Sequence, residues 1–175
     1  RPGGRPVIEE LAQALGIVID SLNVPQVDLV CHSMGGLIAR TYLSGKQTTL
    51  DRFSPPALKR VRKLITLGST HFGFTGLLVN LAPDVQAQAQ VPGSRFLLDL
   101  ATWNQGREDL REVDALAIVG NAGAGGASDG LVAVTSAVYP FWTDVERTRV
   151  VPYCHTDLGI ISTCRAGVLN IANIN

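Results

Sequence analysis

The stretch VDLVCHSMGGLIAR, at residues 27–40, constrains the fold of this chain more than any other part of its sequence. Its first five residues are nearly all apolar, and a short apolar run of this kind predicts a buried strand of a parallel sheet, covered on both faces. From Met34 to about Ser44 the apolar residues recur at the spacing of a helix, and Gly45 suits its end. The stretch therefore predicts a strand, a tight turn at Ser33 and a helix.

The rest of the chain repeats this alternation of strands and helices. Helical periodicity begins near Pro6 and ends at about Ser21, ahead of the first strand. Further strands are predicted at residues 61–70, 114–121 and 147–153, and a closing helix at residues 165–174. Alternating strands and helices form a parallel sheet with helices on both faces. We therefore predict an α/β fold in which residues 1–175 form a single domain.

Composition and charge exclude several classes of function. The formal net charge is zero, and no basic stripe or aromatic-rich basic patch points to a nucleic-acid partner. No apolar run reaches the roughly 20 residues of a transmembrane helix. Charged residues make up 17% of the chain, against about 25% in an average soluble domain; this fits extensive buried strand or an apolar surface for a lipid-like ligand. No targeting signal fixes the compartment, and we favour secretion.

The turn at Ser33 is the strongest candidate for chemistry. A serine hydroxyl is a weak nucleophile, so it needs a base, a group that orients the base, and N–H donors for the oxyanion. A turn between a strand and a helix exposes the hydroxyl, and the helix N-terminus directs backbone N–H groups towards developing negative charge. Gly35 and Gly36 are small enough to let neighbouring backbone approach closely.

Three segments of the sequence resemble a known family. CHSMGG at residues 31–36 looks like the nucleophile elbow of α/β-hydrolases, and of lipases in particular, with Cys31 where the G-x-S-x-G motif has its first glycine. SDGLVAVTSA at residues 128–137 and STHFG at residues 69–73 are similar to segments of bacterial-type lipases and of GPI-inositol-deacylase-like esterases. The resemblance implies an α/β-hydrolase fold, here lacking its N-terminal strands, with Ser33 as the nucleophile.

The catalytic base is expected among the three histidines of the chain, because only histidine titrates near neutral pH without help. His155 follows the last predicted strand, where the resemblance places the catalytic histidine. His71 is the alternative base, although the similar position in lipases shapes the site. His32 neighbours Ser33 on the same turn, so its side chain is expected to point away from the hydroxyl. We expect His32, His71 and Phe72 to line the substrate site.

The acid of the triad is expected between the serine and the histidine in chain order. Asp129 lies in a glycine-rich loop after a predicted strand, and the resemblance gives it the role of orienting His155. An Asp-Gly pair taken alone would indicate only a turn. Asp157, two residues beyond His155, is the alternative acid.

One oxyanion donor is expected to be the backbone N–H of Met34, the residue after the nucleophile. The family's second donor follows an earlier strand, and no strand is predicted before the first helix. We therefore expect the first strands and the second donor to lie upstream of Arg1, since the nucleophile strand would otherwise be a sheet edge with exposed backbone groups.

The substrate is the least specific part of the prediction. Residues 72–111 stand where lipases commonly insert a lid, and their apolar content predicts an acyl-chain pocket or simply a cover for the core. The resemblance implies a serine hydrolase of carboxylic esters, acting on lipids through an acyl-enzyme, without metal or organic cofactor. We expect an ester or lipid as partner, with transient contact to a lipid surface. An acyltransferase or thioesterase, or a non-catalytic hydrolase-like binding domain, are the alternatives.

The three cysteines fit neither a disulfide framework nor a zinc site. Two readings of Cys154 and Cys164 stay open: they pair and close a short loop that contains His155, or both are free thiols in a reduced compartment.

Overall fold

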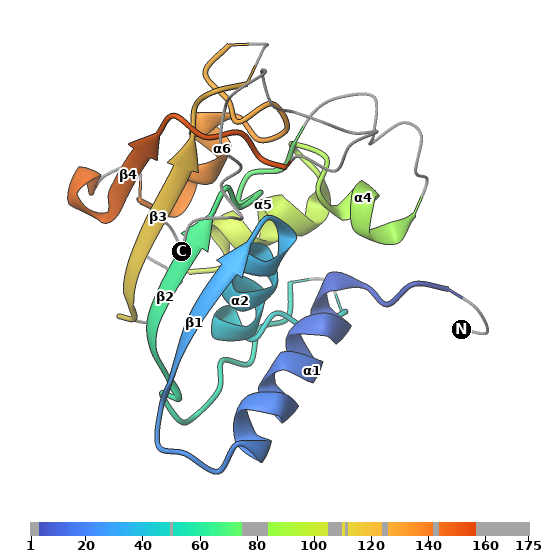
Figure 1. The fold of residues 1–175 in the computed structure, drawn as a ribbon. Coiled ribbons are helices and arrows are strands. Elements are labelled where there is room, and N and C mark those ends of the chain that lie inside the picture. The colour runs from blue at the N-terminus through green and yellow to red at the C-terminus, as the bar shows by residue number, and fades with distance from the viewer. Residues whose placement is uncertain are drawn as a thin grey trace.

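The structure, a computed structural model of the chain, is built on a parallel four-stranded sheet (Figure 1). The structure describes residues 4–49, 51–74, 84–104, 110, 112–123, 126–141 and 144–156. The strands lie side by side in chain order: β1 (Val27–His32), β2 (Val61–Leu67), β3 (Asp114–Gly120) and β4 (Thr148–Val151). The prediction of an α/β fold with a parallel sheet is confirmed, and each strand falls where the apolar patterns place one.

The register of the sheet brings the carboxyl ends of the strands to one edge. Val30 of β1 pairs with Ile65 of β2, which in turn pairs with Leu116 of β3. The turn at Ser33, residues 68–74 and the loop after β3 therefore leave the sheet at the same edge. Ligands of open parallel sheets bind at this edge.

Two long helices pack against each other, and the second also packs against the sheet. α1 (Ile8–Ser21) and α2 (Met34–Ser44) begin and end where the sequence predicts. At the start of α1 the backbone N–H of Val7 donates to the carboxylate of Glu10 at 2.9 Å, which satisfies one of the donors that a helix N-terminus leaves unpaired. α2 lies against β1 and β2, so it holds the turn at Ser33 firmly between a strand and a packed helix.

The described part of the segment predicted as an insertion contains two short helices, α4 (Val85–Ala89) and α5 (Arg95–Thr102). Both have side-chain caps: the carboxylate of Asp84 accepts from the N–H of Gln86 at 2.9 Å, and the hydroxyl of Ser94 accepts from the N–H of Leu97 at 3.2 Å. After β3 come α6 (Val134–Ala137), η1 (Tyr139–Phe141) and η2 (Val145–Arg147).

Two apolar clusters form the core. The larger one joins the inner side of the sheet to the helices and includes Leu64, Ala117 and Val119. The buried members of the smaller one come from α1, α2 and α5: Ile8, Leu37, Phe96, Leu97 and Leu100. Three of these five side chains belong to α5. Burial of apolar surface stabilises a fold by about 25 cal/mol per Å². The apolar side chains that α5 buries against α1 and α2 therefore help to hold these two helices together.

A buried lysine links the same three helices through ion pairs. The Nζ atom of Lys46, just beyond α2, lies 3.5 Å from Glu9 of α1 and 3.6 Å from Asp99 of α5, and its side chain is 2% exposed. Buried charges are tolerated when they are paired. Lys46 therefore fixes the position of α5 relative to the helix that follows the nucleophile turn.

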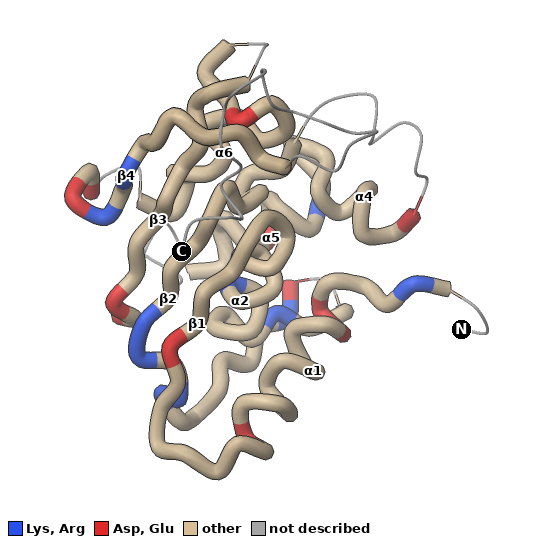
Figure 2. The backbone as a smooth tube through the Cα atoms, viewed as in Figure 1, with Lys and Arg blue, Asp and Glu red and all other residues tan. Residues whose placement is uncertain are grey.

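One face of β1 is open, contrary to the prediction that both of its faces are covered. Val30 is 67% exposed, and Asp28, on the same face, is exposed and bonded to Arg62 at 2.9 Å. Figure 2 shows that other charged residues also lie near the amino-terminal ends of the strands, where Lys63 pairs with Asp114 at 3.0 Å. The reason is the alternation of side chains along a strand: Val30 faces away from the side that α1 and α2 cover.

Candidate active site

Ser33 occupies the turn between β1 and α2 in a backbone conformation that side chains rarely adopt. Its φ is 54° and its ψ is −128°. A non-glycine residue in such a region carries strain of about 1–3 kcal/mol, and strained residues cluster at functional sites. Its backbone N–H donates to the carbonyl of Leu67 at 2.9 Å, so the turn is anchored to the carboxyl end of β2.

Gly36 provides the room for this turn. A Cβ atom at Gly36 would lie 2.1 Å from the Oγ atom of Ser69 and 2.7 Å from its Cβ atom. A Cβ atom at Gly35 would meet only the Cβ of Cys31, at an ordinary 3.7 Å. Gly36 therefore lets the side chain of Ser69 pack directly on the first turn of α2. The close approach of neighbouring backbone that the sequence suggests for the two glycines stays a prediction.

Ser33, His155 and Asp129 form one continuous chain of hydrogen bonds. The Nε2 atom of His155 lies 2.9 Å from the Oγ atom of Ser33, and its Nδ1 atom lies 2.7 Å from Oδ2 of Asp129. Because a carboxylate can only accept, Nδ1 carries the proton and donates it to Asp129. Nε2 then presents a lone pair to the hydroxyl of Ser33. The structure thus brings together the side chains that the sequence suggests as nucleophile, base and acid.

Asp129 is held in place by backbone groups. Its Oδ1 atom accepts from the N–H of Leu131 at 3.0 Å and from the N–H of Val132 at 2.7 Å. These bonds engage one carboxylate oxygen and leave the other facing His155. Asp129 is 1% exposed and His155 is 3% exposed, so water does not compete for their hydrogen bond. Fixed donors in a water-excluded site of this kind are preorganised, and need no rearrangement when charge develops.

Gly68, directly after β2, leaves the space that this pair fills. A Cβ atom there would lie 2.7 Å from Oδ2 of Asp129 and 3.2 Å from Nδ1 of His155, and the φ of Gly68 is 52°. No motif of the sequence points to Gly68. Its only signal, a glycine after an apolar strand, is too common to mark a site.

His32 contacts His155, while the hydrogen bond to Ser33 comes from His155 itself. The ring centroids of the two histidines are 4.7 Å apart, with the planes tilted by 33°. Burial, and then the proximity of His155, lower the pKa of His32. A neutral His32 ring therefore supports one side of His155 without adding a positive charge beside it.

His71 is enclosed in the core at 1% exposure. Neither of its ring nitrogens has a hydrogen-bond partner among the described residues, and its ring meets Phe141 edge-on at 6.4 Å between centroids. Burial, and then the charge of Arg40, hold the pKa of His71 well below its usual value. No hydrogen bond of the described residues joins His71 to Ser33, which leaves it in the packing of the loop after β2.

Phe72 is fixed against the segment that follows Asp129. Its ring stacks on Tyr139 at 4.7 Å between centroids. Its backbone N–H donates to Oγ of Ser136 at 3.1 Å, and Ser136 donates to the carbonyl of Gly73 at 2.6 Å. Ser136 thus joins the loop after β2 to α6. The sequence does not predict this role, although Ser136 lies within SDGLVAVTSA.

Met34 is the first residue of α2, and its backbone N–H has no acceptor among the described residues. The first N–H groups of a helix have no partner within the helix. This donor lies next to Ser33 in the chain and is available to an anion formed there. The second donor remains a prediction.

The alternative acid, the closing helix and the cysteines are described only in part by the structure. Asp157, Cys164 and the predicted closing helix lie outside the described residues. Cys154 is disulfide-bonded, which excludes the reading in which it is a free thiol. Cys31 is free, and burial raises its pKa to about 11, so it is a neutral thiol at physiological pH.

The predicted lid is described only in part. α5 is packed into the core by Phe96, Leu97 and Leu100, as expected of a cover, whereas residues 75–83 and 105–109 lie outside the described residues. A lid function for residues 72–111 therefore stays a prediction. Within the described ranges no helix is long and apolar enough to cross a bilayer, and no three His, Cys, Asp or Glu side chains are arranged to hold a metal ion.

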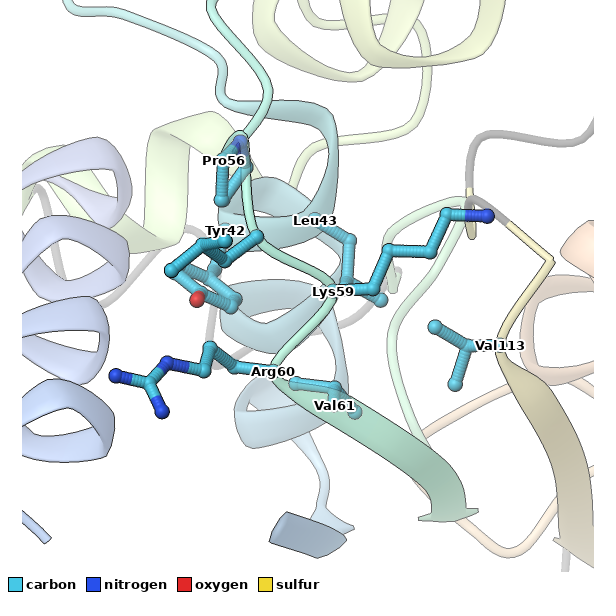
Figure 3. Close-up of a pocket in the computed structure, with 8 residues that line it drawn as sticks. Tyr42, Leu43, Pro56, Lys59, Arg60, Val61 and Val113 are labelled. Carbon is cyan, nitrogen blue, oxygen red and sulfur yellow. The ribbon is translucent and has the colours of Figure 1, made fainter. Parts of the chain in front are cut away.

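Two hollows are lined by residues outside the triad. One, of about 10 Å³, is lined by Tyr42, Leu43 and residues at the start of β2 (Figure 3); that volume holds about one water molecule. The other, of about 280 Å³, lies between α1 and residues 45–56. Neither hollow is lined by Ser33, Asp129 or His155, so neither belongs to the candidate active site.

Solved structures share this architecture. Phospholipase PlaB from Legionella pneumophila, in complex with thio-NAD, is 16% identical with a TM-score of 0.58, and the match covers 75% of this chain and 33% of PlaB. The mature form of the lipase BlEst2 from Bacillus licheniformis is 18% identical with a TM-score of 0.55, and the match covers 94% of this chain and 65% of BlEst2. No protein-family model and no curated protein sequence matches the chain.

These likenesses identify the class of fold. The four parallel strands, the turn at Ser33 and the following helix are part of an α/β-hydrolase fold. The chain spans less than two thirds of the length of either of these proteins.

Proposed function

We propose that this chain carries the catalytic triad of a serine hydrolase that cleaves carboxylic esters. The single observation that supports the proposal most strongly is the hydrogen-bond chain from Ser33 through His155 to Asp129, with distances of 2.9 and 2.7 Å. Nucleophile, base and orienting acid in this order are the minimum that serine needs to attack an acyl group at neutral pH.

In the proposed acylation step, Oγ of Ser33 attacks the ester carbonyl carbon while Nε2 of His155 takes the hydroxyl proton. The tetrahedral oxyanion accepts a hydrogen bond from the N–H of Met34. As the intermediate collapses, the bond to the alcohol oxygen breaks and His155 returns its proton to the leaving alcohol. The acyl group is then bound to Ser33 as an ester.

Deacylation repeats the sequence with water. His155 takes a proton from water, the resulting hydroxide attacks the acyl carbon, and the acid leaves as Ser33 regains its proton. Asp129 stays ionised throughout and stabilises the imidazolium of His155 in both steps. With both side chains almost fully buried, this attraction acts in a medium of low polarity, where it is stronger than in water.

We further propose that the ester is a lipid ester. The low charged fraction of 17% and the apolar content of residues 72–111 suit an acyl chain. Proteins of similar fold include one described as a phospholipase and one described as a lipase. These observations favour a fatty acyl group, while the alcohol part of the substrate is left open.

A fluorophosphonate probe tests the proposed nucleophile directly. The full-length protein should be labelled on Ser33, and Ser33→Ala should not be labelled. A folded full-length protein that stays unlabelled would support a non-catalytic binding domain instead. Hydrolysis rates for p-nitrophenyl esters from acetate to palmitate then test the lipid proposal, which fails if activity is confined to acetate. Product analysis with added alcohol separates hydrolysis from acyl transfer.

A further inference from the structure

The first turn of α2 carries the proposed oxyanion donor but has no side-chain cap. Ser33 is the N-cap residue, yet its hydroxyl makes no capping hydrogen bond and is bonded to His155 instead. Without a cap, the backbone donors at the start of a helix lack the bond that usually restrains them. The position of Met34 must therefore be fixed by other contacts.

Gln90, just beyond α4, makes such a contact. Its Nε2 atom lies 3.3 Å from Sδ of Met34 and 3.2 Å from the carbonyl oxygen of Gln86, and its Oε1 atom lies 2.6 Å from Oγ1 of Thr70. Because the carbonyl of Gln86 can only accept, the amide nitrogen must face it, and Oε1 then accepts from Thr70. The orientation of the amide is thus determined, and Nε2 is the group that faces Met34.

The main chain of Gln90 is anchored as firmly as its side chain. Its carbonyl oxygen accepts from the N–H of Phe74 at 3.1 Å. A Cβ atom at Gly73 would lie 2.4 Å from the same oxygen, so the two backbones are in direct contact. Gln90 is 5% exposed. A residue held at both ends in this way can restrain the more flexible side chain of Met34.

We propose that Gln90 is a positioning residue, which holds Met34 so that its backbone N–H points at the oxyanion formed at Ser33. The proposal rests on the serine-hydrolase function proposed above. Met34 also packs on the smaller apolar cluster, so its side chain is restrained from two directions. Through this contact the segment that contains α4 reaches the nucleophile turn without touching the triad.

The test compares Gln90→Met with the wild type. Methionine has a similar length but no amide, so it fills the space and loses the hydrogen bonds to Met34, Gln86 and Thr70. We expect kcat for p-nitrophenyl butyrate to fall about tenfold, less than the loss of an entire oxyanion donor. The affinity for a trifluoromethyl ketone, which forms an oxyanion on Ser33, should fall by the same factor. KM and the pH profile should not change, because binding of the ester and titration of His155 do not involve Gln90.

Met34→Leu tests the same contact from the other side, and does so even if Gln90→Met does not fold. It removes the sulfur acceptor and should lower kcat and ketone affinity in parallel. The kcat of the double variant should be no lower than that of the less active single variant, since both changes break the same Gln90–Met34 contact. Additive losses, or a fall in melting temperature with kcat and ketone affinity unchanged, would overturn the proposal. An unlabelled wild type in the fluorophosphonate experiment would overturn the proposed function and this inference together; a labelled wild type with a fully active Gln90→Met would overturn this inference alone.

Discussion

Asp129 and His155 are joined by two separate hydrogen bonds, one between their side chains and one between their backbones. Oδ2 of Asp129 lies 2.7 Å from Nδ1 of His155, and the N–H of His155 donates to the carbonyl of Asp129 at 2.8 Å. The backbone bond aligns the two loops, so the side-chain bond forms with little loss of freedom. The imidazole is thereby held in the tautomer that can accept a proton from Ser33.

Asp129→Asn should abolish most of the activity while leaving the fold intact. The amide can donate to Nδ1, which would place the proton on Nε2 and remove the lone pair that faces Ser33. We expect kcat for p-nitrophenyl butyrate to fall by about 10³- to 10⁴-fold, as in triads with the same substitution. Asp157→Asn is the control and should keep its activity. The reverse result, an active Asp129→Asn with an inactive Asp157→Asn, would show that Asp157 is the acid.

Gly68→Ala should damage both stability and activity. The new Cβ atom would lie 2.7 Å from Oδ2 of Asp129, in a backbone conformation with a φ of 52°. Thermal unfolding should show a loss of about 1–3 kcal/mol, and kcat should fall about 100-fold because the Asp129–His155 pair is displaced.

Gly93→Ala is the control for Gly68→Ala, because it introduces backbone strain without a steric clash. Gly93 has a φ of 81°, but a Cβ atom there would meet nothing within 4 Å. This variant should lose stability and keep its activity. Equal kcat values for the two variants would argue against a displaced Asp129–His155 pair.

The fold was largely predictable from the sequence because apolar periodicity reports it directly. The helices α1 and α2 end where the pattern ends, and a polar residue, a glycine or a proline directly follows each strand. Burial was less predictable. Val30 belongs to an apolar run and yet is 67% exposed, because a run of apolar residues does not reveal whether a neighbouring layer is present.

The candidate site was predictable where a motif carries it. Ser33, Asp129 and His155 each lie in a segment with a recognisable pattern and a fixed place in the chain order. Gln90 and Ser136 have no such signal: Gln90 stands in a run of Gln and Ala, and its contacts arise only when α4 packs beside the loop after β2. Gly68 is similar, since its necessity depends on atoms that are distant in sequence.

The burial of His71 predicts a loss of stability in acid. The pKa of His71 is held well below its usual value in the folded state by burial and by Arg40. The unfolded chain therefore binds a proton more readily, and the free energy of unfolding should fall as the pH drops through the ordinary range of histidine, about 6.5. In His71→Phe the difference in unfolding free energy between pH 7.5 and pH 5 should be smaller than in the wild type. An unchanged difference would assign the acid sensitivity to other groups.

Cys31 should be chemically inert in the folded protein. Burial raises its pKa from 9.0 to about 11, and only the thiolate reacts with alkylating reagents. At pH 8, iodoacetamide should leave Cys31 unmodified in the native protein and modify it in urea, as mass spectrometry can detect. Because the unfolded chain loses this proton first, the contribution of Cys31 to stability should decrease as the pH rises from 9 towards 11. Rapid native alkylation would contradict the burial of this thiol.

Lys46→Met should destabilise the protein, because the buried Glu9 loses its ion pair with Lys46 and the buried Asp99 keeps only its ion pair with Arg95, at 2.6 Å. Glu9 and Asp99 lie 3.5 and 3.6 Å from Nζ of Lys46, and Asp99 is 4% exposed. Removal of one partner from a buried ion pair costs about 3–5 kcal/mol, which urea unfolding would measure.

Lys59→Met is the matched control, because its ion pair with Glu112 is exposed, and exposed pairs contribute about 0–1 kcal/mol. The triple variant with Glu9→Gln and Asp99→Asn should recover part of the loss, since neutral amides need no counter-ion. A triple variant no more stable than Lys46→Met would instead place the stabilising effect in the attraction between the ammonium group of Lys46 and the rings of Phe53 and Phe96, whose centroids lie 5.5 and 5.6 Å from Nζ.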